Sequence, residues 1–123
     1  MPHTNGGRDR ALMQHEDHAA RISDLNDQFR RTFVGGIVAA TEGFSALRPD
    51  LNRSFLKAIQ EFDDFTEDND PYREHDFGAI TLEGTPVFFK IDYYDCALIA
   101  GSTNPADPTK TLRVMTIMLA SEY

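Results

Sequence analysis

The segment HDFGAITLEGTPVFFKIDYYD (residues 75–95) carries the strongest structural signal in the sequence. Two stretches rich in β-branched and aromatic residues flank Glu83 and Gly84, and a glycine there can adopt the positive φ that a tight hairpin needs. The second stretch alternates two sets of residues, one apolar and one carrying the charges: Val87, Phe89, Ile91 and Tyr93 against Phe88, Lys90, Asp92 and Tyr94. The pattern predicts a β-hairpin whose first set faces a core.

Helical and extended patterns surround this hairpin. Residues 8–32 lack Pro and Gly and show helical apolar spacing in their second half, which predicts a helix that packs through its C-terminal half. A short strand is predicted at 37–41, a second helix at 49–62 and a closing strand at 111–119. The element order is therefore α-β-α-β-β-β.

We expect a single α+β domain over residues 8–123, preceded by a disordered tail at residues 1–7. Two helices would pack on a mostly antiparallel sheet of about four strands, burying the apolar faces of both. The chain has 123 residues, of which 41% are hydrophobic, enough for one core. It shows no apolar run of membrane-spanning length and no signal-peptide pattern, and its single Cys96 fits a reducing compartment, so we expect a cytoplasmic protein.

The negative charge of the chain is concentrated in one segment. The formal net charge is −8, and residues 61–76 contain eight of the 20 acidic residues and one basic residue, Arg73. We call residues 61–76 the acidic segment. A nucleic-acid-binding protein normally presents a basic face, so we do not expect direct nucleic-acid binding. We expect no membrane partner either. The charge favours a protein partner with a basic surface, or a cation.

Several stretches resemble an uncharacterised bacterial family, domain of unknown function 3768. They include FDDFTEDNDPYREHDFG (62–78), FFKIDYYD (88–95) and TLRVMTIMLASEY (111–123), and the resemblance extends over about residues 22–123. It implies a small cytoplasmic bacterial protein, of a kind often found on plasmids or other mobile elements. The resemblance identifies no catalytic residues in this chain. Cys96 stands where the family resemblance leads us to expect a charged residue.

The leading functional hypothesis is a non-enzymatic binding protein that acts through the acidic segment. Aromatic anchors between spaced carboxylates suit a protein interface, where aromatic residues contribute much of the binding energy and charge speeds association. The expected partner is a host defence factor, which would make the protein an antirestriction or anti-CRISPR-like inhibitor of a mobile element. The candidate binding residues are Asp63, Asp64, Phe65, Glu67, Asp68, Asp70, Tyr72 and Glu74. A solvated connection between helix and sheet would give the same composition.

An alternative hypothesis is a divalent-metal-dependent hydrolase or nuclease-like enzyme. Its candidate catalytic residues are His75, Asp76, Lys90 and Asp92, and its candidate metal ligands are Asp68, Asp70 and Asp76, because carboxylate oxygens suit Mg²⁺, Mn²⁺ or Ca²⁺. The restriction-nuclease pattern fails here, since the residue two before Lys90 is Phe88 and not an acid. A divalent cation is thus the one cofactor left open, and otherwise none is expected.

A third hypothesis is a homodimeric structural or interaction module. Phe88 and Tyr94 lie on the polar side of the predicted hairpin, where they are large for a surface that only meets water. Monomer and homodimer both remain open.

Overall fold

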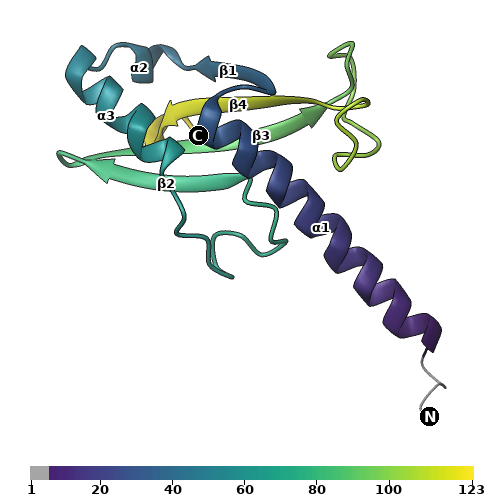
Figure 1. Ribbon diagram of the computed structural model, residues 1–123. Coiled ribbons are helices and arrows are strands. Elements are labelled where there is room, and N and C mark those ends of the chain that lie inside the picture. The colour runs from purple at the N-terminus through teal and green to yellow at the C-terminus, as the bar shows by residue number, and fades with distance from the viewer. Residues whose placement is uncertain (1–5) are drawn as a thin grey trace.

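The computed structural model describes the backbone of residues 6–123 and the side chains from residue 17 onward. It confirms the α+β fold (Figure 1). The elements are α1 (Gly6–Thr32), β1 (Gly36–Ala40), α2 (Glu42–Ser45), α3 (Pro49–Gln60), β2 (Phe77–Leu82), β3 (Thr85–Tyr94), β4 (Leu112–Leu119) and a short 3-10 helix η2 (Ala120–Glu122).

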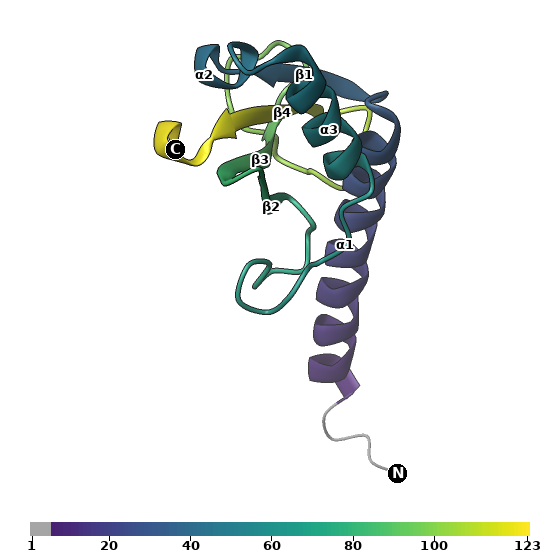
Figure 2. The same ribbon diagram turned by 90° about the vertical axis from the view of Figure 1, so that its left-hand side faces the viewer.

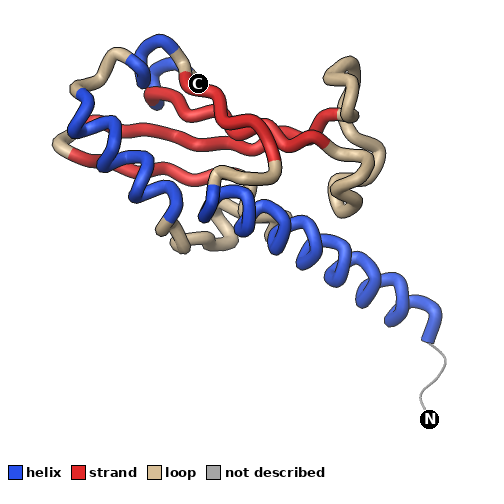
Figure 3. The backbone as a smooth tube through the Cα atoms, turned by 45° about the horizontal axis from the view of Figure 1, so that its top comes forward, coloured by secondary structure: helices blue, strands red, loops and turns tan. Residues whose placement is uncertain are grey.

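The four strands form one mixed sheet in the order β1-β4-β3-β2 (Figure 3). β3 is antiparallel to β2 and β4, as predicted, while β1 lies parallel to β4. The hairpin between β2 and β3 turns at Glu83 and Gly84, whose φ angles are 49° and 75°. Two consecutive positive φ angles are typical of the turn that matches the twist of paired strands.

The helices cover one face of the sheet and leave the other without a helical layer (Figure 2). On the covered face Phe89 lies opposite Ile117 and Ile91 lies opposite Met115 in the β3–β4 ladder. The buried core joins α1, α2, α3 and the two central strands, and it consists of Phe29, Phe44, Leu51, Phe55, Ile59, Val87, Phe89, Ile91, Met115 and Ile117. The alternation predicted for β3 is therefore confirmed.

The long helix α1 packs on the sheet through its second half, where Ile22 and Phe29 are buried. Its first half extends away from the sheet (Figure 1). Of the tail predicted at 1–7, residues 1–5 lie outside the described residues, and Gly6 and Gly7 already belong to α1. No helix in the described part of the chain is long and apolar enough to cross a membrane.

Helix α3 begins at Pro49 and buries Leu51, Phe55 and Ile59, as its spacing predicts. The short helix α2 was not predicted, because four residues do not establish a helical period. It begins after Thr41, whose hydroxyl accepts a hydrogen bond from the amide of Phe44 at 3.4 Å.

Candidate functional site

The acidic segment leaves the end of α3, turns outside the sheet and enters β2, without regular secondary structure between Asp63 and Asp76. Its own hydrogen bonds close it into a compact turn. The amide of Thr66 donates to Oδ1 of Asn69 at 2.8 Å, and Nδ2 of Asn69 donates to the carbonyl of Asp64 at 2.8 Å. The amide of Asp70 donates to the carbonyl of Thr66 at 2.8 Å. These local bonds shape the turn between Asp64 and Asp70, as turn-forming Asn and Asp residues permit.

The side chain of Asp70 stabilises the second half of the segment through hydrogen bonds to its backbone. Its side chain is buried, and Oδ1 accepts the amides of Glu74 at 3.0 Å and His75 at 3.2 Å. These bonds hold Arg73 and His75 in the left-handed region, with φ of 58° at both. Non-glycine residues persist in that region only when their surroundings fix them. Asp70 thus shapes the segment and does not belong to its exposed surface.

His75 fastens the acidic segment to α1. Its Nδ1 lies 2.9 Å from Oδ1 of Asp27, and that oxygen also accepts a hydrogen bond from Arg30 at 2.7 Å. The ring of His75 stacks on Phe65, with centroids 4.0 Å apart and planes 3° apart. The guanidinium of Arg30 lies 5.1 Å from the Phe65 ring centroid. We call Asp27, Arg30, Phe65, Asp70 and His75 the segment anchor.

The pKa of Asp27 reflects its partners in the segment anchor. Burial acts to raise the pKa of Asp27, but the hydrogen bonds from Arg30 and His75, together with their charges, outweigh it and lower that pKa. Nε2 of His75 lies 3.7 Å from Oδ2 of Asp70, so the imidazole sits between two carboxylates. Arg30 is fully buried, and its Nε has no hydrogen-bond partner among the residues described. The buried Arg30–Asp27 pair lies within α1, and the contact between His75 and Asp27 joins that pair to the segment.

A second polar network lies beside the anchor and joins α1 to β3 and β4. Nδ2 of the buried Asn26 donates to the hydroxyl of Tyr93 at 2.7 Å and to the carbonyl of Glu74 at 2.9 Å. The Tyr93 hydroxyl donates to Oε1 of Glu74 at 2.8 Å, and Nε of Arg113 donates to Oδ1 of Asn26 at 2.7 Å. Burial raises the pKa of Tyr93, so the hydroxyl stays a donor. Glu74 therefore points inward.

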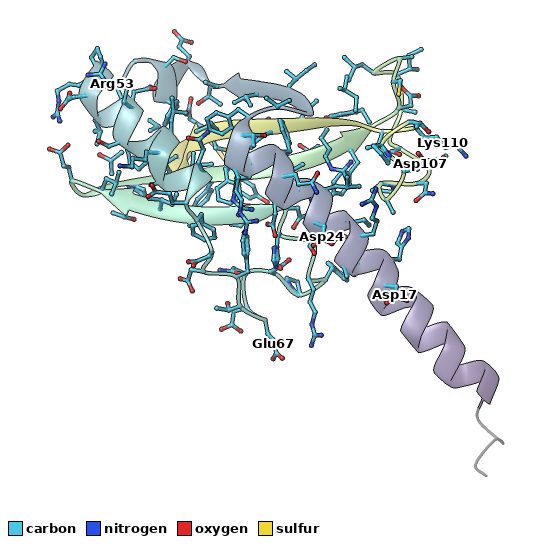
Figure 4. All side chains as sticks on the ribbon, in the orientation of Figure 1. Asp17, Asp24, Arg53, Glu67, Asp107 and Lys110 are labelled. Atoms are coloured by element: carbon cyan, nitrogen blue, oxygen red, sulfur yellow. The ribbon has the colours of Figure 1, made fainter. Side chains whose placement is uncertain are left out.

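The outer acids of the segment remain free for solvent. Asp63, Asp64, Glu67 and Asp68 are exposed, and none of them has a cationic side chain within 4.0 Å among residues 17–123. We call these four residues the acidic arc. Figure 4 shows Glu67 at the tip of the segment, pointing away from the body of the protein. Four unpaired carboxylates on a fixed turn produce a local negative potential.

The two aromatic residues predicted as binding anchors differ in position. Tyr72 is 78% exposed, next to Arg73 on the outer side of the segment. Phe65 is half-buried between His75 and Arg30. Of the eight candidate binding residues, the acidic arc and Tyr72 thus form the surface, while Phe65, Asp70 and Glu74 support it.

The four candidate catalytic residues lie on two sides of the sheet. Lys90 and Asp92 form an ion pair at 3.1 Å, both partly exposed. Phe77 pairs with Lys90 across the β2–β3 ladder, so strand alternation places Asp76 on the opposite, helix-covered face. Asp76 lies beside Ile91 in the ladder, where its carbonyl accepts the amide of Ile91 at 2.8 Å. Its side chain is therefore close to Lys90 and Asp92 along the sheet but on the other face.

The carboxyl group of Asp76 has a raised pKa. Burial, and then the charges of Glu74, Asp70 and Asp92, raise its pKa to about 6. The candidate metal ligands do not converge: Asp68 is exposed, Asp70 accepts backbone amides, and Asp76 is partly buried. Within the described residues no group of three or more His, Cys, Asp or Glu side chains is placed to hold a metal ion.

Sequence reasoning missed the residues that hold the segment in place, above all Asn26, Asp27, Arg30 and Arg113. A signal for one of them was present. Arg113 precedes Met115 and Ile117 at alternating positions of the closing strand, which places a charge on the core face. A charge in such a position requires polar partners. In the structure Arg113 donates hydrogen bonds to Oδ1 of Asn26 and to the carbonyl of Pro105.

Comparison with known proteins gives one relation. No curated protein and no solved structure matches this chain. The model of a family described as Protein of unknown function (DUF3768) matches residues 40–122. The matched region includes the whole acidic segment and the sheet from the end of β1 to the end of β4, and it begins after α1, later than residue 22. Since the match covers more than half of the sequence, the chain belongs to the DUF3768 family.

Proposed function

We propose that this protein is a non-enzymatic binding protein whose acidic arc docks on a basic surface of a partner protein. The observation that supports the proposal is the combination of unpaired charge and fixed backbone. Asp63, Asp64, Glu67 and Asp68 carry no ion pair among the described side chains, yet the turn that bears them is closed by Asn69 and Asp70. A preformed charged surface loses little conformational entropy on binding.

The solvated-connection hypothesis accounts for this arrangement less well. A segment that only joins α3 to β2 does not need a stacked Phe65–His75 pair, a buried carboxylate and two non-glycine residues at positive φ. Each such backbone conformation costs of the order of 1 kcal/mol or more. The cost is consistent with a surface whose shape matters.

The partner class in this proposal is a host defence factor with a basic, nucleic-acid-binding groove. The acidic arc resembles a row of phosphates in charge, and the exposed Tyr72 adds an aromatic contact at its edge. A mobile element, the genomic setting implied by the family resemblance, benefits from such an inhibitor. The enzyme alternative has less support, because its four candidate residues are divided between the two faces of the sheet.

Capture from a host lysate at low and high salt tests the proposal. The test variant combines Asp63→Asn, Glu67→Gln and Asp68→Asn in the acidic arc. The matched control combines Asp17→Asn, Asp24→Asn and Glu42→Gln, which removes the same number of exposed charges elsewhere. We expect a salt-sensitive partner that is retained by the wild type and the control and lost from the test variant.

Two results would overturn the proposed function. One is that no partner is captured in a salt-dependent way. The other is that the acidic-arc variant and the control retain the same partner equally well. Both variants should keep the melting temperature of the wild type within a few degrees, because exposed unpaired carboxylates contribute little to stability.

A further inference from the structure

Strand β1 forms one edge of the sheet and has a free side. It pairs only with β4, and no other described strand lies next to it. The amide of Thr41 donates to the carbonyl of Ile117 in β4 at 3.0 Å. Backbone groups of successive residues in a strand point to opposite sides. The N–H and C=O groups of Gly36, Val38 and Ala40 therefore point to the free side, away from β4.

The sequence of β1, GIVAA, lacks the charge, proline and bulge that often protect an edge strand. Ile37 and Val38 are 43% and 36% exposed. Edge strands with exposed apolar side chains tend to pair with another strand. The other edge strand, β2, exposes Ala79 and Thr81 and is flanked by Asp76 and Glu83. Negative charge at both ends opposes pairing of β2 with its own copy.

An apolar groove lies beside β1 on the helix-covered face. Val38 and Ala40 line it together with Phe44, Leu47 and Leu56 from α2, α3 and their connection, and its volume is about 530 Å³. Side chains brought in by an added strand would enter this groove. Strand addition combines backbone hydrogen bonds with such side-chain pockets.

We propose that β1 pairs antiparallel with β1 of a second copy of this chain, about a two-fold axis at Val38. Val38 then lies opposite Val38 of the second copy, and Gly36 lies opposite Ala40 of the second copy. The backbone N–H and C=O groups of these three residues point toward the partner in each chain. The pairing therefore forms six backbone hydrogen bonds and produces an eight-stranded sheet. A two-fold interface of this kind uses the same patch on both subunits.

The distribution of charge explains why a second copy fits this edge. The chain carries a net charge of −8, and two copies repel each other wherever their acidic segments approach. β1 has no charged residue, and the acidic segment leads into β2 at the opposite edge of the sheet (Figure 1). Pairing through β1 places the two acidic segments at the outer ends of the dimer and leaves both free for a partner.

Sedimentation equilibrium on the full chain tests the pairing. The wild type should populate a species of twice 13.9 kDa as concentration rises. Val38→Lys should shift the protein to the monomer, while Thr81→Lys, at an exposed position of the other edge strand, should leave the dimer intact. A wild type that stays monomeric up to about 1 mM would overturn the proposal.

A cross-linking experiment tests the register independently of any loss of stability. Residues opposed in a hydrogen-bonded antiparallel pair have Cα atoms about 5.5 Å apart, within the range of a disulfide. In a Cys96→Ser background, Val38→Cys should oxidise to a covalent dimer, and Ala79→Cys in β2 should not. Equal cross-linking at both positions contradicts the register. Loss of the dimer in Tyr94→Lys but not in Val38→Lys would instead assign the seam to the uncovered sheet face.

Discussion

At the scale of single residues, the acids of this protein divide into two groups with different roles. Asp27 and Asp70 are withdrawn from solvent and accept several hydrogen bonds, whereas Glu67 and Asp68 accept none from the described residues and face outward. Composition cannot separate the groups, because both contain the same residue types. The two groups differ in the contacts that the fold gives them. Asp27, for example, meets His75, which is 48 residues away in sequence.

Asp27→Asn tests the inward group. The substitution removes the charge that accepts from Arg30 and His75, and the free energy of unfolding at pH 7 should fall by about 1–3 kcal/mol. Because the folded-state pKa of Asp27 is lowered, its contribution is present above the unfolded pKa of about 3.9 and is lost as pH falls through the folded value. Urea titrations at pH 7 and pH 3 should therefore show a deficit that shrinks in acid. Asp24→Asn, exposed on the same helix, serves as the control and should show no deficit.

Asp76 should show the opposite dependence on pH. Its folded-state pKa is raised to about 6, so the folded protein favours the protonated acid. The unfolded chain loses that proton near pH 3.9, and the wild type therefore loses stability between about pH 4 and pH 6. Asp76→Asn should not show this loss, and its stability relative to the wild type should rise over that window. Parallel stability curves for the two proteins would contradict the burial of Asp76.

At the scale of elements, the sequence predicted the long helices and the strands but not the short helix α2 or the order of the irregular acidic segment. Periodicity located α1, α3 and the hairpin, since each repeats a local pattern over many residues. The acidic segment has no period, and beyond its local turn its order comes from contacts with α1 and β3, which lie far away in sequence. The parallel pairing of β1 with β4 was missed for the same reason.

Phe65→Ala tests whether the anchor orders the acidic segment. Without the ring, His75 and Arg30 lose their stacking partner, and stability should fall by about 1–3 kcal/mol. Amide hydrogen exchange at Thr66, Asp70 and His75 should become faster. Tyr72→Ala removes a similar ring from an exposed position of the same segment and should change neither quantity. Equal effects of the two substitutions would show that the anchor has no special role.

At the scale of the whole molecule, the fold separates two surfaces. The acidic segment is attached at the β2 edge of the sheet, and the uncharged strand β1 forms the other edge. A protein with net charge −8 spread evenly would offer a partner no preferred side. Here the sequence allowed the segment to be recognised as acidic, and the three-dimensional structure showed which of its acids are unpaired.

The negative potential of the acidic segment should be local, preformed and accessible to a partner. Its most direct measurement is an NMR titration of the full chain with a lysine- and arginine-rich peptide at low salt. Amide shift changes should be concentrated at residues 61–72, should be lost at about 0.5 M salt, where screening is strong, and should be weakened by the acidic-arc substitutions. Changes spread evenly over the surface, or centred away from the acidic segment, would contradict this prediction.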